Sequence, residues 1–228
     1  MSDLRPGYRE LAAHGALACL LVRVVGEERE RTDVLPDGCS DLIWSAGRGA
    51  FVAGPDTGPV GLTASGGVFV GARFRPGAGG AALGLPLSEL RDLRVPLDAL
   101  RPELAERLPP DLDPRVAARR VAEIALAAAP ADAAIAEAVR RLADPRTRVE
   151  ALAGDLGLSQ RQLRRRFDAA AGYGPKTLQR VLRFRRFLAT ADGDLARAAL
   201  DAGYADQSHL AREVARLAGT TPARLISG

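Results

Sequence analysis

With 228 residues, 47% of them hydrophobic, and a formal net charge of +4 at pH 7, the chain is long enough for two small domains with separate hydrophobic cores. Its apolar run 16–22 is too short to span a membrane and is followed by charged residues, so we expect a cytoplasmic protein without a signal peptide or membrane segment. Cys19 and Cys39 are then expected to be free thiols, with a two-cysteine redox sensor as the alternative.

The first part of the chain has the pattern of a mostly β domain, in which short apolar runs alternate with turns that carry Gly and Pro. The runs are Ala18–Val25, Asp41–Ser45, Phe51–Ala53 and Val68–Phe74. Pro109 and Pro110 mark the end of this region, which we place at residues 1–110. We expect it to act as a sensor or to dimerise.

Side chains of this region predict an effector pocket. Arg73 and Arg75 alternate onto one face of a strand, and paired guanidinium groups suit an anionic or strongly polar molecule. Trp44 would supply an apolar wall beside them, and Asp37 lies in a neighbouring turn. The alternative is that both arginines form structural ion pairs with Asp37 and Asp41.

We expect no metal and no cofactor in this region. Asp37, Cys39 and Asp41 alternate along the chain, but three donors without a nearby His are a poor metal site. The Gly-rich segment 77–80 lacks the Lys and the Ser or Thr of a phosphate-binding loop. An Ala-rich helix from Pro114 to Ala129 follows, so we predict a helical linker at 111–130 and a third segment at 131–228.

A helix-turn-helix unit is predicted over Val149–Phe167. Its apolar residues keep helical spacing on both sides of Gly157, which supplies the turn. Ser159, followed three residues later by Gln162, forms a capping box that begins the second helix.

The second helix of this unit carries three arginines on one side. Leu163 and Phe167 lie four residues apart and point inward, which leaves Arg161, Arg164 and Arg165 exposed. A solvated cationic face is the plain alternative. The capped turn favours DNA recognition, because the second helix of such a unit enters the major groove and Arg can donate two hydrogen bonds to guanine.

Pro175 begins an amphipathic helix that is predicted to reach Ala191, with one apolar side and one strongly basic side. It would span roughly 25 Å, and this length added to the girth of the flanking bundles is compatible with reading two successive major grooves about 34 Å apart. The basic side includes Arg185 and Arg186, from which we expect contacts with phosphates.

A second helix-turn-helix unit is predicted over Leu195–Leu217, with Gly203 at the turn and Asp206 as the cap of the following helix. Its inward residues are Leu210, Val214 and Leu217. Its outward residues, which could reach bases, are Gln207, Ser208 and Arg212. His209 is expected at the surface, in contact with a phosphate.

This arrangement resembles the DNA-binding domain of the AraC-type (arabinose regulator-like) bacterial transcription factors over about Ala131–Ser227. That family has an opening helix, here Ala134–Ala143, then two units on a linker helix, with Gly-x-x-Pro turns that fall here at 172–175 and 219–222. One difference is that the second recognition helix of the family usually carries two Phe, four positions apart, where this chain has Leu210 and Val214.

The resemblance also implies which residues contact DNA. The base-reading positions fall on Arg161, Arg164, Arg165, Gln207, Ser208 and Arg212, in agreement with the faces derived from packing. We assign contacts with the DNA backbone to Ser159, Gln160, Lys176, Arg185, Arg186 and His209.

Two phrases of the first region, at residues 35–44 and 70–78, resemble an uncharacterised N-terminal domain that is attached to one branch of the same family. The resemblance implies a β-rich sensor, for which a shortened relative of the cupin-like sensors is one form. The expected fold class is therefore α+β with several domains: a β-rich N-terminal domain, then an all-α C-terminal domain with two helix-turn-helix units on a linker helix.

The charge distribution supports this division. From Arg146 onward the chain has 15 Lys and Arg against 8 Asp and Glu, a net charge of +7, whereas the residues before it carry −3. The positive charge thus lies in the segment that is expected to bind DNA.

We therefore expect a sequence-specific DNA-binding transcription regulator of the AraC type, controlled by a ligand or partner at its N-terminal domain. Its expected partners are double-stranded DNA, a small-molecule effector, RNA polymerase and a second copy in a homodimer. The alternatives are a non-sensing dimeric DNA binder and an enzyme fused to such a module. We expect no enzyme, because two cysteines cannot build a four-thiolate zinc site and His14 and His209 form no catalytic set.

Overall fold

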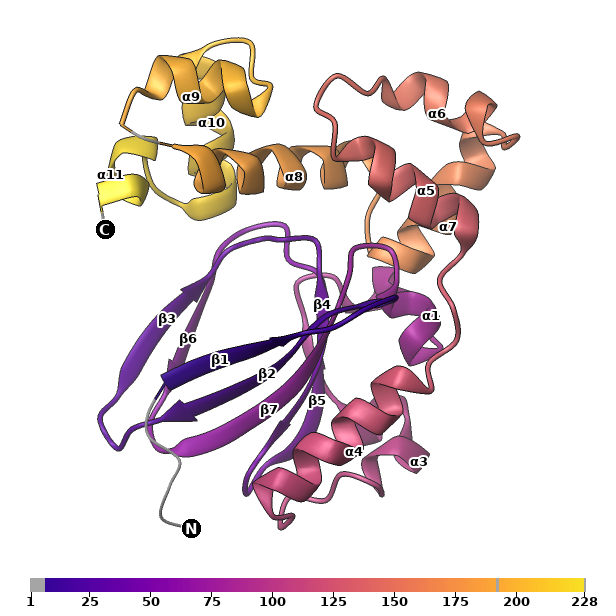
Figure 1. Ribbon diagram of the computed structural model, residues 1–228, viewed down its shortest axis with the longest axis vertical. Helices are drawn as coiled ribbons and strands as arrows, with labels where there is room; N and C mark the ends of the chain where they lie inside the picture. The colour runs from indigo at the N-terminus through magenta and orange to yellow at the C-terminus, as the bar shows by residue number, and fades with distance from the viewer. Residues whose placement is uncertain (1–6, 192, 228) are drawn as a thin grey trace.

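The computed structural model describes residues 7–191 and 193–227, with a β-rich part at the bottom and a helical part at the top of Figure 1. Residues 1–6 and 228, at the outer ends of the two expected domains, lie outside the described residues. The strands are β1 Gly7–Ala12, β2 Leu17–Val25, β3 Glu30–Val34, β4 Ser40–Ser45, β5 Gly49–Ala53, β6 Val60–Ala64, β7 Gly67–Phe74 and β8 Arg94–Pro96.

Six of these strands form one antiparallel sheet in the order β1-β2-β7-β4-β5-β8, while β3 and β6 pair with each other. The side chains alternate between the two faces of the sheet. Leu42 and Trp44 of β4 lie on one face, together with Ala72 of β7, and all three are buried. Asp41 and Arg73, which are paired in register across β4 and β7, lie on the other face. The β-rich expectation is confirmed, and in the described residues β1 and β8 remain as free edges of an open sheet.

The helix that we expected to link the domains instead covers the apolar face of this sheet. α4 spans Pro114–Leu126, and its buried side chains Ala117, Val121 and Ile124 keep the spacing of one helical face. They belong to the same hydrophobic core as Leu42 and Trp44. Shorter elements complete this part: α1 Gly79–Leu83, the 3₁₀ helix η1 Leu87–Leu90, α2 Leu97–Leu100 and α3 Pro102–Ala105.

The C-terminal helices surround a second core, centred on α8. They are α5 Ala133–Leu142, α6 Val149–Asp155, α7 Gln160–Ala171, α8 Pro175–Thr190, α9 Leu195–Ala202, α10 Gln207–Ala218 and α11 Pro222–Ser227. α8 runs between the α6–α7 unit and the α9–α10 unit (Figure 1). Its side chains Leu178, Val181, Phe184 and Phe187 are completely buried, so both units pack on one helix.

Elements with a strong apolar pattern were predicted with bounds correct to within a few residues, and elements with a weak pattern were missed. The predicted helices at Pro175–Ala191 and Ala134–Ala143 correspond to α8 and α5, and all four predicted strands exist. β1, β3 and β6 were not predicted, because these edge strands are largely exposed and lack the apolar alternation that marks a half-buried strand.

The last buried residue of the N-terminal core is Ala125, and the first buried residue of the C-terminal core is Ile135. The segment between α4 and α5 contains no helix or strand, and its residues are partly or fully exposed. We therefore propose a domain boundary at 127–132, with α4 assigned to the N-terminal domain. This differs from the linker at 111–130, since the apolar face of α4 would be left in water if the helix stood free.

The two parts of the chain are nevertheless docked against each other through α7. The Arg91 side chain donates a hydrogen bond from Nε to the Gly172 carbonyl oxygen, at 2.7 Å. α1 approaches the backbone of α7 so closely that a Cβ at Gly80 would lie 2.4 Å from the Ala169 carbonyl oxygen. Gly80 is thus required for this contact, because backbone atoms cannot move aside as a flexible side chain can.

We predict that Gly80→Ala disturbs this docking and lowers the free energy of unfolding by about 1–3 kcal/mol, as overpacking does. Gly154→Ala is the matched control: its Cβ would meet nothing within 4 Å, and replacing a helical Gly stabilises by up to about 1 kcal/mol. Chemical denaturation measures both changes. Equal effects of the two substitutions would contradict the close contact.

Candidate nucleic-acid interface

The first helix-turn-helix unit has the local geometry that the sequence predicts. Gly157 adopts a φ of 67° at the turn, a conformation that favours glycine. The Gln162 backbone N–H donates to Ser159 Oγ at 3.2 Å, and the Ser159 N–H donates to Gln162 Oε1 at 2.9 Å. This complete capping box fixes where α7 begins and therefore which of its sides faces the core.

The outer side of α7 carries the three predicted arginines. Leu163 and Phe167 are buried in the C-terminal core, whereas Arg161, Arg164 and Arg165 are all exposed. The only ion pair that any of the three makes among the described residues joins Arg164 Nε to Asp168 Oδ2 at 3.8 Å, with the Arg164 side chain 80% exposed. Such a pair contributes little, so all three guanidinium groups remain available to a ligand.

The second unit repeats the arrangement with a different cap. Gly203 has a φ of 88°, and Asp206 Oδ1 accepts a hydrogen bond from the His209 N–H at 2.7 Å, which begins α10. Leu210 and Val214 are completely buried, so these side chains seal the core although they are smaller than the Phe pair of the related family. The exposed residues at the start of this helix include Gln207, Ser208 and Arg212.

His209 is partly exposed and packs against the turn that follows Gly203. The Ala205 N–H donates to its Nδ1 at 3.4 Å, and its ring meets the Tyr204 ring edge to face, with centroids 5.3 Å apart. Because Nδ1 accepts this bond, the neutral imidazole carries its proton on Nε2. That N–H is the group His209 can offer to a phosphate.

The residues assigned to the DNA backbone lie on several sides of the domain. Ser159 and Gln160 are at the start of α7, and the Gln160 amide donates to the Glu150 carbonyl oxygen at 2.7 Å. Lys176 Nζ lies 2.8 Å from Glu150 Oε1, in an exposed pair near the start of α8. These groups neighbour the first unit.

Arg185 and Arg186 are both exposed residues of α8. Arg185 follows Leu178 by two turns, and Leu178 contacts Gly38 in the β-rich part. Arg186 follows Gln179 by the same distance, and the Gln179 amide donates to the Thr147 carbonyl oxygen at 2.8 Å. The sequence places both arginines on a basic surface but does not determine their directions.

The structure also shows charged residues that the sequence reasoning missed. Arg180 on α8 pairs with Glu213 on α10 through two hydrogen bonds, Nε to Oε2 at 2.9 Å and a terminal nitrogen to Oε1 at 3.1 Å. Burial of Glu213 is the largest single influence and opposes its ionisation, but the hydrogen bonds from Arg180 and the positive charges of Arg180 and Arg216 together lower the pKa of this carboxyl. No helical spacing links the two residues, so only the packing of α10 on α8 reveals the pair.

The N-terminal part reaches the edge of the arginine-bearing side of α7. Pro86, Ser88 and Glu89 line a shallow hollow of about 500 Å³ together with Arg161 and Arg165. α1 and η1 both pack against α7, and their close contacts fall at its C-terminal half. The N-terminal half, which enters the major groove in such units, stays open.

The four residues of the predicted effector pocket do not gather in one place. Arg73 Nε donates to Asp41 Oδ1 at 2.9 Å, and another nitrogen of Arg73 lies 3.5 Å from Asp37 Oδ2. Trp44 is buried on the opposite face of the sheet, where its indole N–H donates to the Pro109 carbonyl oxygen at 2.8 Å. Arg75 is exposed, and its guanidinium donates to the Ala13 carbonyl oxygen at 3.5 Å. Arg73 thus forms the structural ion pairs of the alternative, whereas Arg75 has no carboxylate partner among the described residues.

The cysteines have the character of structural thiols. Burial raises the pKa of both Cys19 and Cys39, with a further contribution from Asp37 at Cys39. Cys19 is on β2 and Cys39 precedes β4, with β7 between the two strands, a separation too wide for a disulfide.

In the described part of the chain, no group of three His, Cys, Asp or Glu is arranged to hold a metal ion. No helix within 7–191 and 193–227 combines the length and apolar character needed to cross a membrane.

Two family models match parts of the chain. Residues 152–227 match a helix-turn-helix domain, and residues 14–96 match a domain of unknown function (DUF6597). A comparison with curated proteins found no match.

Solved structures of ToxT from Vibrio cholerae are similar to this chain at low identity. One ToxT structure is 11% identical, covers 91% of this chain and 98% of its own, and has a TM-score of 0.48. ToxT from Vibrio cholerae O395 is 10% identical, with 96% and 97% covered and a TM-score of 0.46. A wild-type ToxT described as bound to an unsaturated fatty acid, from strain SCE256, is 11% identical, with 90% and 94% covered and a TM-score of 0.44.

We predict that Arg73→Ala lowers the free energy of unfolding by about 3–5 kcal/mol, because it leaves Asp41 buried without its partner. Burial already raises the pKa of the Asp41 carboxyl, and the Arg73 charge opposes this rise. Arg75→Ala is the control and should cost less than about 1 kcal/mol, since Arg75 is exposed. Urea denaturation of both variants decides: a near-neutral Arg73→Ala would show that this pair is not structural.

The Arg180–Glu213 pair should make stability depend on pH. Because the pKa of Glu213 in the folded chain lies below its ordinary value of 4.5, the ionised carboxylate stabilises the fold above that pH and loses this effect as the pH falls further. Glu213→Gln should cost about 1–3 kcal/mol at pH 7, and the difference from wild type should shrink toward pH 3.5. Glu137→Gln, in an exposed pair, should show a much smaller difference at both values. A pH-independent loss in Glu213→Gln would mean that packing, not charge, is responsible.

Proposed function

We propose that this chain, which carries a helix-turn-helix domain, is a DNA-binding transcription regulator of the AraC type that reads a specific DNA sequence with α7 and α10 and is controlled through its β-rich N-terminal part. The observation that carries the proposal is the pair of capped recognition helices on one buried helix. α8 has 16 residues and is therefore roughly 24 Å long. Together with the girth of the flanking helices, this length suits two successive major grooves about 34 Å apart.

Base reading falls to the exposed residues at the N-terminal halves of the two recognition helices. In α7 these are Arg161, Arg164 and Arg165, and in α10 they are Gln207, Ser208 and Arg212. Arginine donates two parallel hydrogen bonds to guanine, whereas the amide of Gln pairs with adenine. α7 thus has the stronger charge, and α10 adds polar specificity.

Contacts with the DNA backbone are proposed for Ser159, Gln160, Lys176 and His209, which lie at or near helix starts. The N-terminus of a helix attracts phosphate through its free N–H groups. Arg185 and Arg186 are exposed on α8, and we propose that they strengthen binding through the charge that they add to the domain.

Control is proposed to act through the contact between the N-terminal part and α7. An effector or partner that changes this contact would alter how α7 is presented, provided that it binds the two arrangements with different affinity. RNA polymerase and a second copy of the chain are proposed as further partners, on the family resemblance alone. The protein would act by binding, without catalysis, in the bacterial cytoplasm.

We predict that Arg165→Ala weakens binding to the preferred site by roughly 1–3 kcal/mol and relaxes the preference at one base pair. Arg186→Ala should weaken preferred and random DNA alike, because a charge away from the bases carries no sequence information. Selection of bound fragments from a genomic pool supplies the site, and fluorescence titrations of both variants measure the losses. Equal losses on preferred and random DNA in Arg165→Ala would refute base reading by α7.

A further inference from the structure

A cleft of about 320 Å³ lies where the N-terminal part meets α8 and α10. The N-terminal part contributes Thr57, Arg91 and Asp92, and the helical part contributes Thr177, Arg180 and Arg216. Its one apolar lining residue is Leu217, so the walls offer charge and hydrogen bonds and little surface for a hydrocarbon chain.

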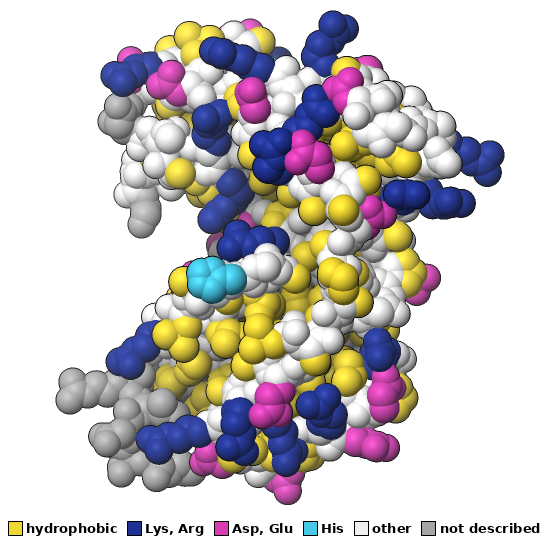
Figure 2. Space-filling model, turned by 45° about the vertical axis from the view of Figure 1, so that its right-hand side comes forward, with side chains coloured by type: hydrophobic (Ala, Val, Ile, Leu, Met, Phe, Trp, Pro, Cys, Tyr) yellow, Lys and Arg dark blue, Asp and Glu magenta, His cyan; other side chains and the backbone are white. Residues whose placement is uncertain are grey.

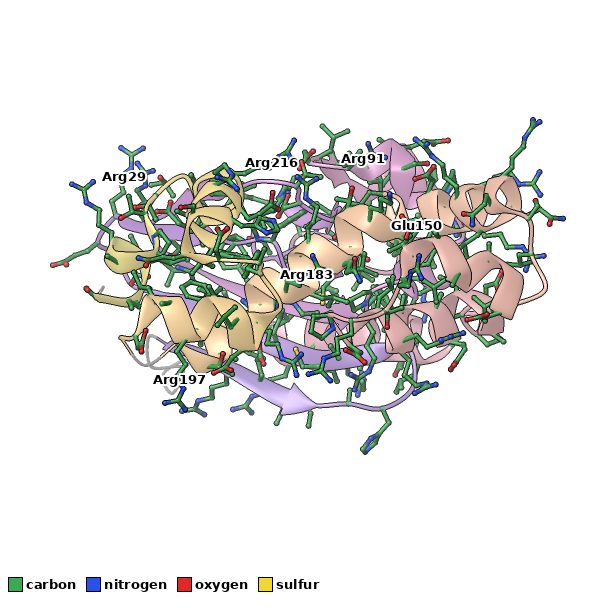
Figure 3. The ribbon with its side chains drawn as sticks, turned by 90° about the horizontal axis from the view of Figure 1, so that it is seen from above. Arg29, Arg91, Glu150, Arg183, Arg197 and Arg216 are labelled. Atoms are coloured by element: carbon green, nitrogen blue, oxygen red, sulfur yellow. The ribbon has the colours of Figure 1, made fainter. Side chains whose placement is uncertain are left out.

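Two of the three arginines in this cleft have donors to spare. Arg91 uses only Nε, which donates to the Gly172 carbonyl oxygen, and Arg216 has no ion-pair partner in the described residues. Arg180 is already engaged by Glu213. Arg91 and Arg216 are labelled at one edge of the view from above in Figure 3.

The one carboxylate that lines the cleft is occupied within the N-terminal part. Asp92 Oδ1 accepts hydrogen bonds from the Thr57 N–H at 2.6 Å and from Thr57 Oγ1 at 3.0 Å. Asp92 has a φ of 59°, the only positive value at a non-glycine position in the described chain. This sparsely populated conformation is held by the Thr57 contacts and fixes the backbone beside Arg91. Asp92 therefore braces the loop and, among the described residues, forms no ion pair with Arg91 or Arg216.

The cleft lies on the side of the protein that presents both recognition helices. Arg216 follows Arg212 by four residues, and so lies one turn further along the same side of α10. The segment 86–92 borders both surfaces: its first residues line the hollow beside the arginines of α7, and its last residues line the cleft beside Arg216. Arg91 thus stands between the two units.

We propose that this cleft binds a phosphate-like oxyanion between Arg91 of the N-terminal part and Arg216 of α10. Planar guanidinium groups donate paired hydrogen bonds to such oxygens, and the Thr177 hydroxyl can add a neutral donor. The anion is either a small free molecule or a backbone phosphate of bound DNA. In both cases it joins the two parts of the chain, and only the DNA case rests on the function proposed above.

The first arm of the test uses pyrophosphate without DNA. Isothermal titration at constant ionic strength should show saturable binding of pyrophosphate to the full chain, weakened at least about tenfold in Arg216→Gln and in Arg91→Gln. Glutamine keeps an N–H donor for the Gly172 carbonyl oxygen, so docking of the two parts can persist, and thermal melting checks that each variant folds. The controls are Arg29→Gln in the loop before β3 and Arg197→Gln on α9, which do not line the cleft and should bind as wild type does.

The second arm uses DNA without pyrophosphate. If a backbone phosphate occupies the cleft, Arg91→Gln and Arg216→Gln should each weaken binding to every sequence and reduce the slope of log affinity against log salt by about 1, while Arg29→Gln leaves it unchanged. An effect in the first arm alone identifies a free anion, and an effect in the second arm alone identifies DNA.

Unchanged behaviour of both cleft variants in both arms would overturn the proposal. So would pyrophosphate binding that is lost equally in the control variants, because that would be general attraction to a basic protein. Wild-type binding to DNA is measured in the same titrations, so failure of the regulator function is distinguished from failure of the anion site.

Discussion

Burial of α8 is the constraint on which the rest of the molecule depends. Phe184 and Phe187 are completely buried, as are Leu178 and Val181, so the apolar side of the helix is covered by both helix-turn-helix units and by the N-terminal part. A single rigid helix therefore sets the separation of the two recognition helices. Large-to-small changes at such positions cost several kcal/mol, which makes the spacing a property of the core and not of a flexible linker.

The same packing brings the β-rich part to the surface that is proposed to bind DNA. Because Gly38 contacts Leu178 and Gly80 contacts the backbone of α7, the N-terminal part touches α8 and α7 directly. α4 stabilises that part by covering the apolar face of its sheet (Figure 1). A change inside the β-rich part can thus reach α7 through contacts between rigid elements, without an intervening linker.

Charge is distributed between two roles. Arg73, Arg94 and Arg180 each meet a carboxylate that is largely buried, so they hold elements together. Arg161, Arg165 and the other arginines at the surface of the helical part are free of such partners, and Figure 2 shows Lys and Arg spread over the outside of the upper part of the molecule. The first group stabilises the fold, while the second group is available to an anion.

The sequence by itself determined the elements whose signals are local. A capping box depends on residues three apart and a glycine turn on one residue, so Ser159 with Gln162 and Gly203 could be identified without the fold. The exposed arginine side of α7 followed from the spacing of Leu163 and Phe167. Tertiary structure alone decided what depends on distant contacts: the packing of α4 on the sheet, the opposite faces of Trp44 and Arg73, and the position of Arg91 and Arg216 on one cleft. Periodicity says which side of an element is apolar, but not which distant element covers it.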